Sequence, residues 1–133
     1  MKKYLFLSII TLCCINIAFA NDTAQELMPV LKQLNVELLQ FSSKMYSCTP
    51  YKQQLTSYSR PVFYEVVGVE GNACHVIKEG QDCYYPKNVI QNYALKRIQD
   101  YKSNIDNINK KQSYVSTSAN DEYYNQIDNQ YCK

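Results

Sequence analysis

The positions of the cysteines constrain the fold more than any other feature of the sequence. Two of the six lie in an apolar leader, and the other four are Cys48, Cys74, Cys83 and Cys132. An even number of cysteines in a small exported domain is typical of disulfides. A zinc site would need close ligand pairs such as C-x-x-C, and the sequence has none. We therefore predict two disulfides and no metal site, with free or intermolecular thiols as the alternative.

The first twenty residues have the pattern of a secretory signal peptide. Residues 1–3 carry Lys2 and Lys3, residues 4–14 are largely apolar, and Ala18-Phe19-Ala20 offers a cleavage site. The apolar stretch is shorter than the ~20 residues that cross a bilayer. We expect a signal peptide over residues 1–20, a periplasmic or secreted protein, and no stable membrane insertion after cleavage. An uncleaved anchor and a lipoprotein are the alternatives.

Removal of this leader leaves a chain without net charge. The sequence has fourteen Lys and Arg against twelve Asp and Glu, and loss of Lys2 and Lys3 makes the numbers equal. Nucleic-acid binding needs a basic surface, so we expect no nucleic-acid partner. The remaining residues suffice for one domain that buries about two-thirds of its unfolded surface.

Two amphipathic helices are predicted, one on each side of a β-rich middle. Apolar residues repeat at spacings of four and three over residues 27–45, and a second stripe follows Pro86 and runs to near Asn107. Glu37 and Arg97 fall on the polar sides. The stripes consist of Leu27, Leu31, Leu34, Leu38, Phe41 and Met45 in the first helix, and Ile90, Ala94, Ile98, Tyr101, Ile105 and Ile108 in the second.

Between the helices, β-branched and aromatic runs predict strands separated by turns. The predicted strands are Tyr51–Tyr58, Val62–Val69, Ala73–Glu79 and a short one at Cys83–Tyr85. This order predicts an α+β domain over residues 21–108, a small antiparallel three- to four-stranded sheet flanked by two amphipathic helices. A helical hairpin with a β-excursion is the alternative.

The four cysteines allow three disulfide connectivities. In a meander, the first and third strands begin at the same end of the sheet, which favours Cys48–Cys74 with Cys83–Cys132. Residues 109–133 contain few apolar side chains other than tyrosines. We predict a polar C-terminal arm there, with at most one helical turn, tethered by Cys132.

No catalytic constellation is evident, so we do not expect an enzyme or a cofactor. A catalytic triad would have to use His75, the single histidine, but no nucleophile motif accompanies it. Glu65, Glu79 and Asp82 could form a carboxylate pair. The turn at Gly71 instead predicts Glu65 opposite Lys78, as a cross-strand ion pair.

Tyrosine is the one residue in clear excess, with thirteen in the chain and no tryptophan. Tyrosine suits binding surfaces because its ring is apolar and its tip is polar. The pairs Tyr84-Tyr85 and Tyr123-Tyr124 are therefore a candidate binding surface. AT-rich codon usage is the alternative explanation.

Several short motifs resemble those of uncharacterised small exported proteins of Gram-negative bacteria. The motifs are Cys48-Thr49-Pro50, the Gly71-x-x-Cys74 hairpin, and Cys83 before the last predicted helix. The resemblance covers about residues 48–101. It implies export and a disulfide core, and it carries no known activity.

Taken together, these features predict an exported binding or accessory protein. Its partner would be an unknown protein or envelope component, and an inhibitor or immunity-type protein is one concrete form. A structural or assembly component of an envelope or secretion apparatus is the alternative. A small hydrolase and a small-ligand carrier are further options.

Overall fold

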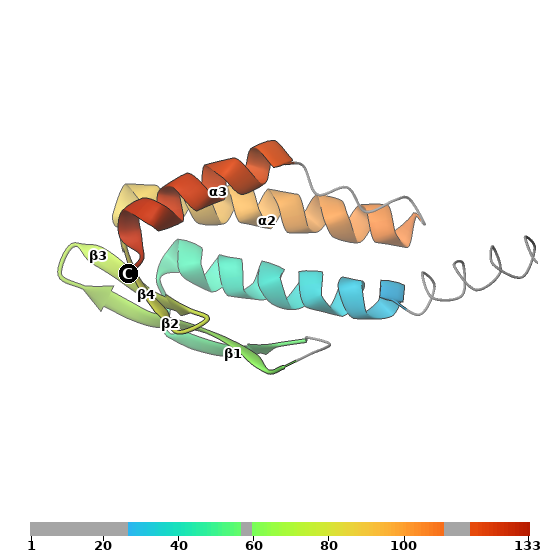
Figure 1. The fold of residues 1–133 in the computed structure, drawn as a ribbon, viewed down its shortest axis with the longest axis horizontal. Coiled ribbons are helices and arrows are strands. Elements are labelled where there is room, and N and C mark those ends of the chain that lie inside the picture. Colours follow the sequence, from blue (N-terminus) through green and yellow to red (C-terminus); the bar gives the residue numbers. More distant parts are fainter. Residues whose placement is uncertain (1–26, 57–59, 111–117) are drawn as a thin grey trace, which may run out of the picture. The chain divides into compact units, whose positions relative to one another are not determined.

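The computed structural model describes residues 27–56, 60–110 and 118–133 of the chain (Figure 1). The chain divides into two compact units, Met1–Leu31 and Lys32–Lys133. In the first unit, residues 27–31 are helical. The predicted signal peptide and its cleavage site lie outside the described residues. The second unit holds the sheet, the disulfides and the core.

Four strands form one antiparallel sheet in the order β1-β2-β3-β4 (Figure 1). The strands are β1 (Tyr51–Leu55), β2 (Val62–Glu70), β3 (Ala73–Lys78) and β4 (Gln81–Pro86). The predicted meander is confirmed, with a complete fourth strand. β1 ends at Leu55, and the next backbone N–H, that of Thr56, donates a 2.7 Å hydrogen bond to the Glu37 carboxylate. The last two residues of the predicted strand, 57 and 58, lie outside the described residues.

The helices of the second unit all pack on one face of the sheet (Figure 1). Residues 27–47 are helical, and α2 (Lys87–Asn109) and α3 (Ser118–Tyr131) follow the strands. The core combines the inner face of the sheet with one side of each helix. The α+β fold class is confirmed. The core residues are Phe41, Met45, Val66, Cys74, Val76, Cys83, Tyr85, Ile90, Tyr93, Ala94 and Tyr124.

Both disulfides join a helix end to the sheet. The bonded pairs are Cys48–Cys74 and Cys83–Cys132, which confirms the favoured connectivity. Cys132 also bridges to Cys83 along the edge of β4. Next to it, the Asp82 N–H donates to the Lys133 carbonyl (3.2 Å) and the Lys133 N–H donates to the Asp82 carbonyl (2.9 Å). Cys132 and Lys133 therefore cover part of one sheet edge.

The segment predicted as a polar arm instead contains a fourteen-residue helix, α3. Tyr124 is only 2% exposed and belongs to the core, while Ile127 and Tyr131 pack against it. These three residues follow helical spacing, so one side of a polar-looking helix carries large apolar area. The prediction of an arm with at most one helical turn was wrong for this segment, because tyrosine rings pack α3 against the core.

The predicted pairing of Glu65 with Lys78 was wrong by one residue. Glu65 lies opposite Ile77, because β2 contains an irregularity between Val66 and Gly68 that inserts one extra residue. Gly68 has a φ of 130°, which side-chain-bearing residues rarely adopt. A one-residue shift exchanges the faces of a strand. Lys78 therefore points to the helix side of the sheet and Glu65 to the other side.

Two residues that were predicted on the polar sides of the helices contact other elements of the structure. Glu37 is 8% exposed and accepts hydrogen bonds from Gln33 and Thr56. Arg97 packs its guanidinium 3.5 Å from the ring centre of Tyr124. That side of α2 was expected to face solvent, but α3 covers it.

Candidate functional site

The sheet face that points away from the helices is the open face. Successive residues of a strand point to opposite faces of a sheet, and cross-strand partners point to the same face. Residues next to the inward-facing Val66, Val76 and Cys83, and their cross-strand partners, therefore belong to the open face. Two aromatic residues stand out on it: Phe63 is 61% exposed and Tyr84 is 44% exposed. The open face consists of Lys52, Gln54, Phe63, Glu65, His75, Ile77, Asp82 and Tyr84, with Glu70 at its end.

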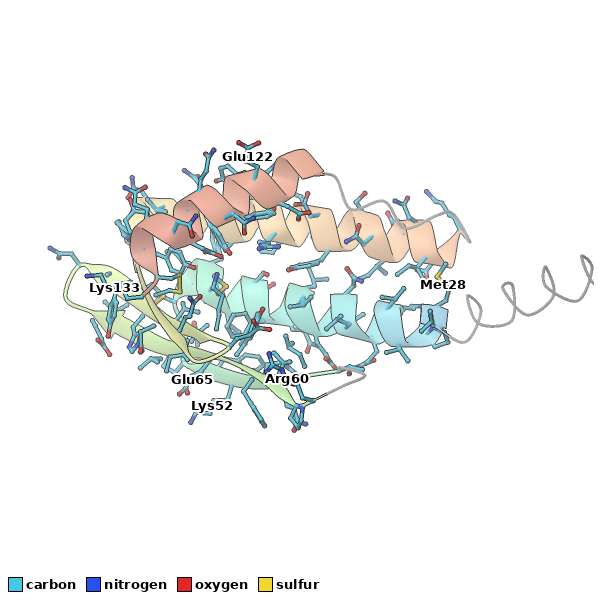
Figure 2. All side chains as sticks on the ribbon, in the orientation of Figure 1. Met28, Lys52, Arg60, Glu65, Glu122 and Lys133 are labelled. Atoms are coloured by element: carbon cyan, nitrogen blue, oxygen red, sulfur yellow. A yellow bond between two sulfur atoms is a disulfide. The ribbon has the colours of Figure 1, made fainter. Side chains whose placement is uncertain are left out.

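Charged residues lie between these two aromatics on the open face. Lys52 and Glu65 form an ion pair across β1 and β2, with 3.4 Å between Nζ and Oε1. Figure 2 shows both side chains projecting from the sheet on the side opposite the helices. On β4 and at the end of β2, Asp82 and Glu70 have side chains that are about half exposed. The open face thus carries Phe63 near the start of β2 and Tyr84 on the edge strand β4, with a row of mostly charged residues between them.

His75 is the most buried member of the open face, at 8% exposure. Its ring stacks on Tyr84 with 4.4 Å between centroids. Nδ1 lies 2.8 Å from Glu70 Oε1 and Nε2 lies 2.6 Å from Asp82 Oδ1. Ionised carboxylates only accept hydrogen bonds, so both contacts are hydrogen bonds when both ring nitrogens carry protons. The geometry therefore favours the imidazolium form of His75.

The titration of His75 gives a testable pH dependence. Burial alone would lower the pKa of His75, but the hydrogen bonds to Glu70 and Asp82 outweigh burial and raise the pKa above 6.5. A raised pKa stabilises the fold fully below pH 6.5, and the stabilisation is lost as the pH rises through the folded-state value. The single histidine gives one C2-proton resonance, and NMR should place its midpoint above 6.5.

Thermal unfolding of a matched variant tests the same pH dependence. The variant His75→Gln should unfold at a temperature that changes less between pH 6 and pH 8 than that of the parent protein. A resonance with a midpoint at or below 6.5 would contradict the proposed imidazolium.

The carboxylates considered for catalysis have separate surroundings. Glu65 pairs with Lys52, Asp82 contacts His75, and Glu79 lies exposed in the turn after β3 with a φ of 50°. None of the three is paired with another. Within residues 27–56, 60–110 and 118–133, no cluster of three His, Cys, Asp or Glu side chains could hold a metal ion.

The four tyrosines of the predicted binding surface divide between surface and core. Tyr84 lies on the open face, whereas Tyr85 is completely buried and Tyr124 nearly so. Tyr123 is partly buried against the core, with Lys96 over its ring at 5.5 Å. Tyr85 and Tyr124 therefore cannot form a surface in this fold, and the prediction was wrong for them. Phe63 and Tyr46 are exposed aromatics that were not predicted as surface residues, and Phe63 is the one of the two that lies on the open face.

On the helix side, a polar network surrounds Asp128 of α3. Its carboxylate accepts hydrogen bonds from Lys78 Nζ (2.7 Å), the Tyr85 hydroxyl (2.6 Å) and the Tyr93 hydroxyl (3.2 Å). The charge-assisted bond to Lys78 is partly buried, which strengthens it relative to a surface pair. Asp128 was not predicted as a site residue, because residues 109–133 were predicted to form a polar arm and not a packed helix. Asp128 lies four residues after Tyr124, and this spacing places both residues on the same side of a helix. The spacing was the sequence signal that could have identified Asp128.

A cavity of about 360 Å³ lies beside this network. Its walls come from the helix at residues 34–45, from the sheet, from α2 and from Asp128 of α3. Arg97, Lys78, Glu79 and Tyr64 line it together with apolar side chains. The cavity and the open face are therefore on opposite sides of the sheet.

None of the helices described is both long and apolar enough to cross a membrane. Comparison of the chain with protein-family models, with curated proteins and with solved structures produced no match.

Proposed function

We propose that this is an exported, disulfide-stabilised protein that binds a protein partner through the open face of its sheet. The observation that carries the proposal is the exposure of Phe63 and Tyr84 on a face that no described helix covers. Large exposed aromatics with a polar rim are typical of interaction sites. Two disulfides are compatible with an oxidising compartment, and the predicted signal peptide supports export.

The charges of the open face indicate the chemistry of the partner. Lys52 and Glu65 neutralise one another, while Glu70 and Asp82 face the single imidazole of His75. The open face beside Tyr84 is therefore acidic. Since interfaces place opposite charges against each other, we expect the partner to present an apolar pocket flanked by Lys or Arg.

The proposal is tested by placing a photo-reactive residue on the open face. Introduced at position 63 in the native host, it should cross-link to one protein of discrete mass. The same residue at position 95 is the control, because Leu95 is 46% exposed but lies on α2. It should give no such adduct. Mass spectrometry of the adduct identifies the partner and the contact residues.

Phe63→Asp provides the quantitative prediction. An aromatic side chain buried in an interface contributes about 2 kcal/mol or more, so this variant should bind the cross-linked partner at least ~30-fold more weakly. Leu95→Asp should leave affinity unchanged. Equal adducts from both positions would contradict the proposal, as would unchanged affinity of Phe63→Asp. Adducts made only of this chain would instead favour the assembly-component alternative.

A further inference from the structure

The cavity on the helix side of the sheet has one apolar wall. That wall comes from the helix at residues 34–45, the end of β1 and the start of β2. The cavity has a volume of about 360 Å³, at the lower end of the range for small-molecule sites. It therefore suits a small organic molecule better than a polypeptide segment. The apolar residues are Leu34, Leu38, Phe41, Met45, Leu55 and Val62.

Arg97 gives the other side of the cavity a positive charge without a paired carboxylate. Its guanidinium lies on the Tyr124 ring and donates two long hydrogen bonds of 3.4 Å, to the hydroxyls of Tyr93 and Tyr101. Within the described ranges, no carboxylate forms an ion pair with Arg97. Of the two carboxylates that line the cavity, Asp128 is paired with Lys78, and Glu79 forms no ion pair within the described ranges.

A guanidinium in such a position can bind a further anion. It has five N–H donors, and Arg97 makes only two hydrogen bonds to other described residues. A half-buried cation is better stabilised by a carboxylate, which accepts two parallel hydrogen bonds, than by phenolic oxygens. An anion entering the cavity would therefore gain a contact that the protein itself leaves unmade.

Tyr64 adds a second donor on the same cavity. It lines the cavity from β2, and its hydroxyl makes no hydrogen bond to any other residue in the described ranges. Burial, together with the negative charge of Glu79, raises the pKa of Tyr64 to about 12. The hydroxyl therefore keeps its proton at neutral pH and can donate a hydrogen bond to an anion.

We propose that this cavity binds a small amphipathic anion, a carboxylate with an aliphatic chain. The carboxylate pairs with Arg97 and accepts a hydrogen bond from Tyr64. The aliphatic chain lies along the apolar wall. This ligand site is independent of partner binding, because it lies on the opposite side of the sheet from the open face.

Calorimetric titration of the oxidised, secreted protein with decanoate below its micelle concentration tests the proposal. We expect saturable binding of one decanoate per chain. Hydrogen bonds to charged groups contribute about 1.5–3 kcal/mol, so Arg97→Gln should weaken binding about tenfold or more. Tyr64→Phe, which removes only the hydroxyl, should weaken it by a few-fold.

Lys96→Gln is the matched control, because it removes one positive charge from the same helix. Lys96 lies over Tyr123 and does not line the cavity, so its replacement should leave affinity unchanged. Decanol, which has the same chain without the charge, should bind at least tenfold more weakly than decanoate.

Three results would overturn the proposal: no saturable binding of decanoate, equal binding of decanol, or equal affinities of Arg97→Gln and Lys96→Gln. Arg97 also packs on Tyr124, so thermal unfolding of each variant is measured first. If Arg97→Gln does not fold, the comparison of decanol with decanoate and the Tyr64→Phe variant decide the question.

Discussion

Replacement of Asp128 by alanine is expected to lower the free energy of unfolding by about 3 kcal/mol. Removing one partner of a buried ion pair typically costs 3–5 kcal/mol, because the other charge is left uncompensated. Here Lys78 retains 12% side-chain exposure and Asp128 retains 24%, which places the loss at the lower end. The hydroxyls of Tyr85 and Tyr93 would lose their acceptor as well.

Urea denaturation followed by near-ultraviolet circular dichroism measures this loss, since the tyrosines of the core dominate the signal. Glu122→Ala is the matched control on the same helix. The Glu122 side chain is exposed and accepts only a 3.3 Å hydrogen bond from Gln126, so its removal should cost a few tenths of a kcal/mol. Similar losses in both variants would show that the Asp128 network does not hold α3 to the sheet.

The second large effect is expected on removal of the Cys83–Cys132 disulfide. The two cysteines are 49 residues apart, and the chain-entropy relation gives a loss of about 4 kcal/mol. The double variant Cys83→Ser with Cys132→Ser should also loosen α3, which this disulfide ties to β4. Hydrogen exchange of the backbone amides in α3 should increase more than exchange in β2.

The other disulfide provides the comparison. Cys48 and Cys74 are 26 residues apart, for which the same relation gives about 3.5 kcal/mol. Its removal should leave hydrogen exchange in α3 close to that of the parent protein. Because small domains have about 5–15 kcal/mol of stability in total, reduction of both disulfides should unfold most of the chain. If the Cys83–Cys132 variant left α3 protected, the packing of Tyr124 and the hydrogen bonds of Asp128 would suffice to hold α3 in place.

Local patterns in the sequence were sufficient to predict most of the fold. The stripe that includes Phe41 and Met45 identified the first helix, and the run Val62–Val69 identified the longest strand. The stripe reflects burial of one side of a helix, and the run reflects the preference of β-branched and aromatic residues for strands. Both signals are local to one element. The disulfide pairing followed from the order of the strands alone.

Features that depend on contacts between distant elements were not predicted. Arg97 was placed on a solvent-exposed side because α3, which covers that side, was not recognised. The backbone irregularity beside Gly68 altered the partner of Glu65, and no local signal located it. The exposed aromatic Phe63 has the same type of sequence environment as buried strand residues, so only the structure distinguishes it.

The candidate site was predicted only in part. Tyr84 was predicted as part of a binding surface because it belongs to the tyrosine pair Tyr84-Tyr85. The contacts of His75 with Glu70 and Asp82 join three different strand positions and require the register. The cavity beside Arg97 is formed by elements from both ends of the described chain, so no single segment of the sequence indicates it.

The covering of β4 by Cys132 and Lys133 limits how copies of this protein can associate. β1 is the opposite edge, and within the described ranges it pairs with β2 alone. An uncovered edge strand can accept a strand from another molecule. Two copies joined β1 to β1 would leave the two β4 edges at the ends of the joined sheet, each partly covered by Cys132 and Lys133. Such association therefore favours a dimer over a fibre.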